Sequence, residues 1–134
     1  MKFGFKRKNH LKSKRLIDEL FSKGKALNKP PFRLIFLEVT DSGYIGAQVL
    51  ISVPKRRFKL AVSRNRIRRL VSESYRLNSI ELQQQITTEK KHLAIAFIYM
   101  GKKEMSFSVI DQQMKEILAD LSLKINIEKQ SDGR

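Results

Sequence analysis

Four arginines surround one asparagine in the stretch Arg64-Asn65-Arg66-Ile67-Arg68-Arg69. A guanidinium group presents a planar fork of N–H donors that matches two phosphate oxygens, and an asparagine amide both donates and accepts hydrogen bonds. A second basic stretch, Lys55-Arg56-Arg57-Phe58-Lys59, comes shortly before, and the chain has no acidic residue between Lys55 and Arg69. Solvated helix faces usually interleave acids with bases. The run therefore predicts contact with the phosphates of a nucleic acid.

Acid–base catalysis by the protein itself would depend on His10 and His92, the two histidines of the sequence. In a two-histidine ribonuclease, one imidazole accepts the 2′-hydroxyl proton and the other protonates the leaving oxygen. His10 lies in a basic segment and His92 begins an apolar run, and no pattern brings them together. The sequence therefore favours binding, with no catalytic residue expected and the two-histidine nuclease kept as a lesser alternative. There is no cysteine, no paired-histidine spacing and no Asp-x-Asp cluster, so we expect no metal site in the protein.

The composition supports the binding hypothesis. The 134 residues include 28 Lys and Arg against 13 Asp and Glu, a formal charge of +15 and a pI near 10.3, which is typical of nucleic-acid-binding proteins. The longest apolar run, Leu93 to Met100, is far shorter than the roughly 20 residues that a membrane helix needs, and Met1 to Phe5 lacks a signal-peptide core. We expect a cytoplasmic protein with no membrane and no small-molecule partner. Its predicted parts are a basic arm over 1–12, one α/β domain over 13–124 and a flexible tail over 125–134.

The elements that would position the arginines can be predicted from apolar periodicity. Leu16, Ile17, Leu20 and Phe21 follow Ser13 at helical spacing, which predicts a helix over about 13–23 that ends at a left-handed Gly24. Pro30-Pro31 breaks the chain. Apolar and β-branched residues over 32–39 and 44–53, separated by a turn at 41–43, predict a hairpin.

The pattern changes to helical spacing over about 60–77. Its apolar stripe runs from Leu60 to Leu77, and the arginines fall largely on the opposite side. The polar, glutamine-rich residues 81–91 predict an exposed connection. A buried strand is predicted over 92–100, and a last helix is predicted around 110–121, with Ser106 or Ser108 as its cap.

The order of these parts resembles the protein component of bacterial ribonuclease P. The resemblance rests on Leu20-Phe21-Ser22-Lys23-Gly24 at the end of the first helix, on Ser52-Val53-Pro54-Lys55-Arg56, and on Ala61-Val62-Ser63 leading into Arg64-Asn65-Arg66. It covers about residues 5–121. The Arg-Asn-Arg core with the following arginine pair is its most specific part.

The resemblance implies an α/β fold of the α+β two-layer sandwich type, shared with a ribosomal protein domain. It has about four strands in a mixed sheet, three helices and a left-handed β-α-β crossover around the arginine helix. The implied partners are the ribonuclease P RNA subunit and the single-stranded 5′ leader of precursor tRNA. Residues matching the RNA-subunit contact are Lys55, Arg56, Arg64, Asn65, Arg66, Arg68 and Arg69. Residues matching the leader cleft, between the first helix and the sheet, are Ile17, Phe21, Phe32 and Ile35. Many relatives have aromatic residues where this chain has Ile17 and Ile35, so at these two positions we expect apolar contact with the leader rather than base stacking.

The activity implied by the resemblance is release of the 5′ leader by metal-activated water in an active site built from RNA. Magnesium would belong to the RNA-containing holoenzyme, and the protein alone would bind no cofactor. The protein would neutralise charge and hold the substrate in register. A ribosomal protein or RNA chaperone, which needs the same basic surface but no leader cleft, is the alternative.

Overall fold

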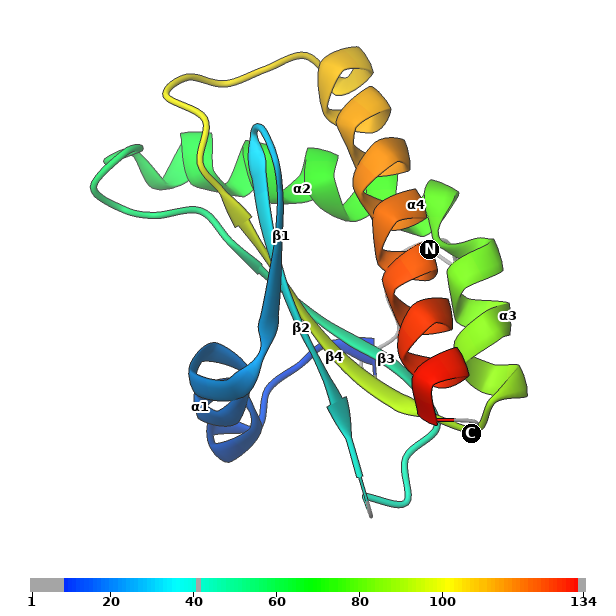
Figure 1. The fold of residues 1–134 in the computed structure, drawn as a ribbon. Helices are drawn as coiled ribbons and strands as arrows, with labels where there is room; N and C mark the ends of the chain where they lie inside the picture. Colours follow the sequence, from blue (N-terminus) through cyan, green and yellow to red (C-terminus); the bar gives the residue numbers. More distant parts are fainter. Residues whose placement is uncertain (1–8, 41, 133–134) are drawn as a thin grey trace.

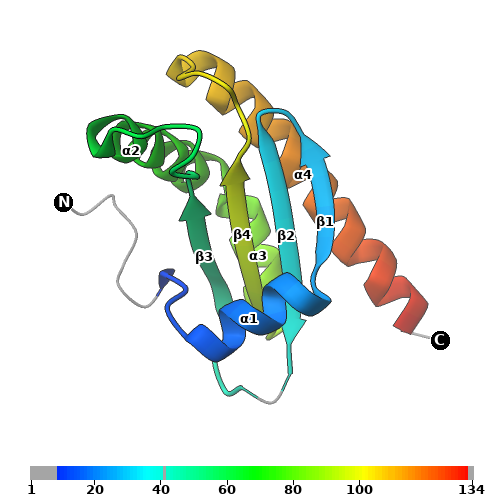
Figure 2. The ribbon, with the colours of Figure 1, turned by 90° about the vertical axis from the view of Figure 1, so that its left-hand side faces the viewer.

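The structure is a computed structural model that describes residues 9–40 and 42–132, with side chains as far as residue 125. One sheet contains the strands in the order β1-β2-β4-β3. Helix α1 lies on one face of the sheet, and α2, α3 and α4 lie on the other (Figure 1, Figure 2). The predicted α+β fold is confirmed, with four helices in the described residues where three were expected. The bounds are α1 (Lys14–Lys23), β1 (Lys25–Lys29), β2 (Phe32–Val39), β3 (Gly46–Ser52), α2 (Ala61–Asn78), α3 (Ile80–Thr88), β4 (His92–Tyr99) and α4 (Phe107–Asp132).

The central position of β4 shows that the predicted hairpin of 32–39 with 44–53 is wrong. β4 pairs antiparallel with β2 and parallel with β3, and so separates these two strands. β2 forms its hairpin with β1 instead, through a turn at Pro30-Pro31, whose peptide bond is cis. The physical reason lies in β4, where His92 to Phe97 are all buried. A strand that is apolar on both faces is most stable with a neighbour on each edge and a layer on each face.

The connection from β3 to β4 passes through α2 and α3 and is left-handed. In Figure 2 both strands point upward, β4 lies to the right of β3, and α3 lies behind the sheet. Most crossovers between parallel strands have the opposite hand, which suits the right-handed twist of strands. The left-handed crossover that the family resemblance implies is thus present.

Alternation along the strands divides the core between the two faces of the sheet. Leu34 and Phe36 of β2 face α2, α3 and α4. Ile35, between them, faces α1 and packs with Leu16 and Leu20. Each face of the sheet therefore has its own apolar cluster.

Helix α2 packs through the middle of the predicted stripe, where Ile67, Val71 and Ser74 are buried, but the two ends of the stripe are wrong. Leu60 and Leu77 are exposed, whereas Tyr75 is buried and meets the ring of Phe97 edge-on at 5.7 Å between centroids. Tyr75 lies one turn beyond Val71, which is also buried, so it continues the buried side of the helix.

Helix α3 occupies most of the stretch predicted as an exposed connection. Its polar residues face solvent, but Leu82 and Ile86, one turn apart, are buried in the core. Helix α4 begins after Ser106, whose hydroxyl accepts a hydrogen bond from the Val109 amide at 3.3 Å. It continues past residue 124, where the predicted tail starts, and Ile125 still packs in the core. Within the described ranges no helix is both long enough and apolar enough to cross a membrane.

Helix α1 has the predicted boundaries, but Gly24 ends it for a different reason. Its φ is −68°, so the backbone is not left-handed. A Cβ at this position would lie 2.4 Å from the carbonyl oxygen of Leu20 and 2.7 Å from Cγ2 of Ile35. Glycine is required because the end of α1 approaches β2 too closely for a side chain.

Candidate nucleic-acid interface

The first two turns of α2 hold the arginine run on the surface. Ile67 is fully buried and fixes the inward side of the helix. Because neighbouring residues on a helix point about 100° apart, the side chains before and after Ile67 project outward. The predicted contact residues Arg64, Asn65, Arg66, Arg68 and Arg69 are accordingly exposed or half-buried.

Arg64 connects the helix to the basic loop before it. Its Nη1 donates to the carbonyl oxygens of Phe58, at 2.8 Å, and Lys59, at 3.0 Å. The loop is further anchored by the burial of Phe58. Lys55 and Arg56, both exposed on this loop, are thereby held close to the start of α2.

Arg66 forms a bidentate ion pair with Glu104, from the loop between β4 and α4. The distances are 2.6 Å from Nε to Oε1 and 2.9 Å from Nη2 to Oε2. These hydrogen bonds and the attraction between the charges raise the pKa of Arg66 and lower the pKa of Glu104. The local sequence contains no acid near Arg66, so only the fold supplies this partner.

Asn65 also acts within the helix. Its Oδ1 accepts a hydrogen bond from Nη1 of Arg68 at 2.9 Å. This contact restrains one arginine of the pair Arg68-Arg69. The asparagine therefore helps to order the cationic surface, in addition to any contact of its own.

A groove of about 320 Å³ lies between residues 10–12, strand β3 and helix α2. The amide of Leu11 donates to the carbonyl of Val49 at 3.0 Å, which holds the chain against the edge of β3. The groove thus combines apolar residues with cations from two segments far apart in sequence. Its lining consists of His10, Leu11, Lys12, Val49, Leu50, Ile51, Arg68, Arg69 and Ser72.

The sequence pattern does not place Lys12, Leu11 and Leu50 in a site. Lys12 belongs to the predicted basic arm, but its position beside Arg68 depends on a pairing between residues 11 and 49. Such a long-range contact leaves no periodic signal in the sequence. The part of the arm before residue 9 lies outside the described residues.

The structure brings together two of the four predicted leader-cleft residues, leaves Phe21 exposed on α1 and separates Phe32 from the rest. Ile17 and Ile35 belong to the apolar cluster between α1 and the sheet, and Phe21 lies near the end of α1 with 46% of its surface exposed. Phe32 is only 2% exposed and packs in the other cluster, against Phe97 at 5.8 Å. Residues 32 and 35 of one strand point to opposite faces, so Phe32 cannot share a floor with Ile35.

His92 is held as a structural residue. It is 5% exposed, its Nδ1 lies 2.7 Å from Ser42 Oγ, and its Nε2 lies 2.8 Å from Gln48 Oε1. Burial lowers its pKa, which favours the neutral ring. His10, by contrast, is exposed and forms a β-bridge with Val49. The side chains that surround His92 occupy both of its ring nitrogens, so the structure gives no support to a two-histidine nuclease.

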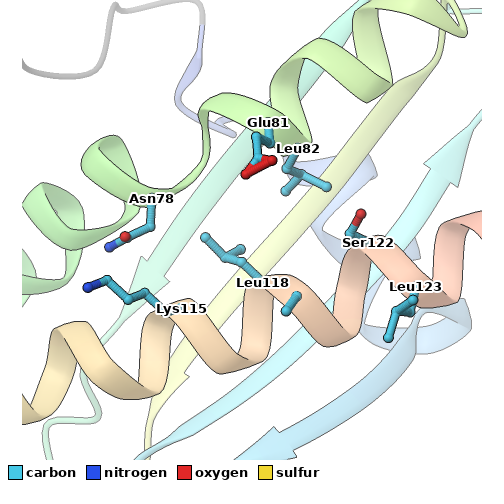
Figure 3. A pocket seen from close by; sticks show the side chains of 8 residues that line it. Asn78, Glu81, Leu82, Lys115, Leu118, Ser122 and Leu123 are labelled. Carbon is cyan, nitrogen blue, oxygen red and sulfur yellow. The ribbon is translucent and has the colours of Figure 1, made fainter.

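A second hollow, of about 530 Å³, lies between α3 and α4 (Figure 3). Leu82 and Leu118 project into it, and Glu81 lies at its edge. Its two charged lining residues, Glu81 and Lys115, carry opposite charges, so the lining has no net positive charge. The candidate interface is therefore the cationic surface of α2 and the groove beside it.

Together the mixed sheet, the left-handed crossover and the cationic helix define an α+β protein with a surface suited to binding a polyanion. The family model described as Ribonuclease P matches residues 5–122. The ribonuclease P protein component of Porphyromonas gingivalis strain W83 is 31% identical over 116 residues, which cover 87% of this chain and 85% of that protein. The chain belongs to the ribonuclease P protein family, and a subunit role in the 5′ maturation of tRNA follows from this membership.

Solved structures agree with the fold. The RNase P protein of Staphylococcus aureus superimposes with a TM-score of 0.66 at 18% identity, covering 84% of this chain and 94% of that one. The RNase P protein of Thermotoga maritima gives a TM-score of 0.62 at 22% identity, covering 81% and 94%. At these identities the likeness concerns the arrangement of helices and strands.

Proposed function

We propose that this protein contacts two RNA molecules in a ribonuclease P holoenzyme through two adjoining surfaces. The exposed side of α2, together with Lys55 and Arg56, would bind phosphates of the RNA subunit. The apolar cluster beside α1 and the groove at Lys12 would receive the 5′ leader of precursor tRNA. The observation that carries the proposal is the concentration of arginines on the exposed side of a helix whose buried side is fixed by Ile67.

The groove suits a single strand of RNA because it combines two kinds of contact. Lys12, Arg68 and Arg69 can neutralise backbone phosphates, and Leu11 and Leu50 offer apolar surface to bases. Ile17 and Phe21 extend apolar surface along α1. Apolar side chains contact bases without hydrogen bonds that select among them, so this surface would accept leaders of varied sequence.

In the proposed mechanism the cleavage chemistry belongs to the RNA. The protein reduces the repulsion between two polyanions and holds the substrate in register, which lowers the entropic cost of reaching the reactive geometry. Magnesium, bound by the holoenzyme rather than by the protein, would activate the attacking water. The compartment of this reaction would be the cytoplasm.

Reconstitution with a bacterial ribonuclease P RNA tests this proposal. At low magnesium the protein should restore cleavage of precursor tRNA at the 5′ end of the mature sequence, and the protein freed of RNA should cleave nothing. Binding of the RNA subunit without restored cleavage would favour a general RNA chaperone. Site-specific cleavage by the protein alone, abolished by changing His92 or His10, would favour a protein nuclease.

Single charge removals then locate the contact. Arg66→Ala, on the exposed side of α2 and outside the groove, should weaken binding of the RNA subunit and reduce the slope of log K against log salt by about 0.7 to 0.9 for each phosphate that is no longer neutralised. Lys124→Ala is the matched control, because it removes one exposed cation from α4, outside the arginine run and the groove beside it. Equal effects of the two substitutions would show that only net charge matters and would remove α2 from the interface.

A further inference from the structure

Glu104 holds Arg66 by one edge of its guanidinium group. The carboxylate accepts from Nε and from Nη2, at 2.6 and 2.9 Å, and also bonds the side chain of Ser63 in the first turn of α2. The loop that carries Glu104 is itself restrained, since the Tyr99 hydroxyl donates to the carbonyl of Lys103 at 2.8 Å. Arg66 therefore has a fixed partner on a fixed loop.

The ion pair leaves a second edge of the guanidinium group for another acceptor. A guanidinium group has five N–H bonds, and Glu104 uses one on Nε and one on Nη2. The edge formed by Nη1 and the second N–H of Nη2 matches the spacing of two phosphate oxygens. About half of the Arg66 side chain, 53%, is exposed, against 34% for Glu104. A phosphate could thus bind Arg66 without displacing Glu104.

We infer that Glu104 is a positioning residue for the RNA contact, holding Arg66 with its Nη1/Nη2 edge toward a phosphate of the RNA subunit. The inference rests on the proposed function of α2. An arginine side chain that is already ordered loses less rotamer entropy on binding than a free one. Removal of Glu104 should therefore weaken RNA binding by about 2- to 10-fold, the effect expected from losing the order of one long side chain.

Simple electrostatics predicts the opposite sign. Loss of the Glu104 carboxylate raises the formal charge of the protein from +15 to +16, which by itself strengthens binding to a polyanion. A carboxylate that merely competed with phosphate for Arg66 would also give tighter binding when removed. The sign of the change therefore separates positioning from both charge and competition.

The test measures the Kd for the ribonuclease P RNA subunit at several salt concentrations for wild type, Glu104→Ala and Glu104→Gln. The amide of Gln can still accept a hydrogen bond from Arg66, so it should restore binding to within about twofold of wild type. Glu81→Ala is the charge control, because it removes an exposed carboxylate from α3, outside the arginine run and the groove beside it, and it should bind equally well or more tightly. Thermal melting of each variant checks that it is folded.

A double-variant cycle tests whether Glu104 acts through Arg66. In an Arg66→Ala background, Glu104→Ala should cause no further weakening. The positioning role would be overturned if Glu104→Ala bound RNA more tightly than wild type, as Glu81→Ala is expected to do. It would also be overturned if Glu104→Ala weakened RNA binding equally in the wild-type and the Arg66→Ala backgrounds. Failure of the wild-type protein to bind the RNA subunit would overturn the proposed function instead. If Arg66→Ala binds the RNA subunit as tightly as wild type, neither Arg66 nor Glu104 belongs to the interface.

Discussion

Phe21 and Phe32 form a matched pair that distinguishes a leader contact from core packing. Complete burial of a Phe side chain is worth about 1.5 to 3 kcal/mol. Because Phe21 keeps 46% of its surface exposed, Phe21→Ala should cost about 1 to 1.5 kcal/mol of folding free energy. Phe32 is 2% exposed and packs against Phe97 and Tyr99, so Phe32→Ala should cost about 3 to 5 kcal/mol.

In substrate binding the order of the two effects should be reversed, with the larger loss of affinity for precursor tRNA in Phe21→Ala. If the ring of Phe21 contacts a base of the leader, its loss should weaken the holoenzyme's affinity for precursor tRNA by about 1 to 3 kcal/mol, which is about 5- to 150-fold. Affinity for mature tRNA, which has no leader, should be unchanged. Phe32→Ala, measured where it is still folded, should weaken both ligands alike or neither.

Chemical denaturation of the free proteins and titration of reconstituted holoenzyme with each tRNA provide the measurements. The placement of Phe21 on the surface and Phe32 in the core would be refuted if Phe21→Ala lost as much stability as Phe32→Ala. The leader contact would be refuted by equal weakening of precursor and mature tRNA in a stable Phe21→Ala variant.

Two further predictions concern the scaffold. Burial lowers the pKa of His92 in the folded protein. As the pH falls through about 6.5, the ordinary pKa of histidine, the unfolded chain therefore takes up a proton that the folded protein does not. The stability that the neutral, buried His92 contributes is full above this pH and is lost on acidification. His92→Gln should therefore lose less stability than wild type between about pH 6.5 and 5, as measured by denaturant titration. The same dependence of unfolding free energy on pH in both proteins would show that His92 does not contribute. Gly24→Ala should cost about 1 to 3 kcal/mol, because the new Cβ would meet the Leu20 carbonyl oxygen at 2.4 Å; a variant as stable as wild type would show that α1 can move away from β2.

Several features of this protein were predictable from local pattern. The helix at 14–23 follows from apolar residues at helical spacing after a serine cap, and Ser13 Oγ does accept from the Leu16 amide, at 3.2 Å. The arginine helix and the buried strand β4 follow from similarly local signals. Even the placement of Phe32 was within reach, since positions 32 and 35 of one strand must face opposite sides of a sheet.

The strand pairing and the polar partners were not predictable in this way. The turn at 41–43 is consistent with a hairpin, and only the demand of β4 for two neighbours places that strand between β2 and β3. Helix α3 depends on two apolar residues, Leu82 and Ile86, whose burial requires the rest of the core.

The sequence by itself determined that the protein is basic, that its arginines lie on one exposed helical surface, and that it belongs with RNA-binding proteins. Net charge and helical periodicity are properties of composition and of neighbours along the chain, so they need no fold. The tertiary structure alone decided that Glu104 would hold Arg66 and that Lys12 would stand beside Arg68 and Arg69. These contacts join segments tens of residues apart, and short-range patterns carry no information about which distant segments the packing of the core will bring together.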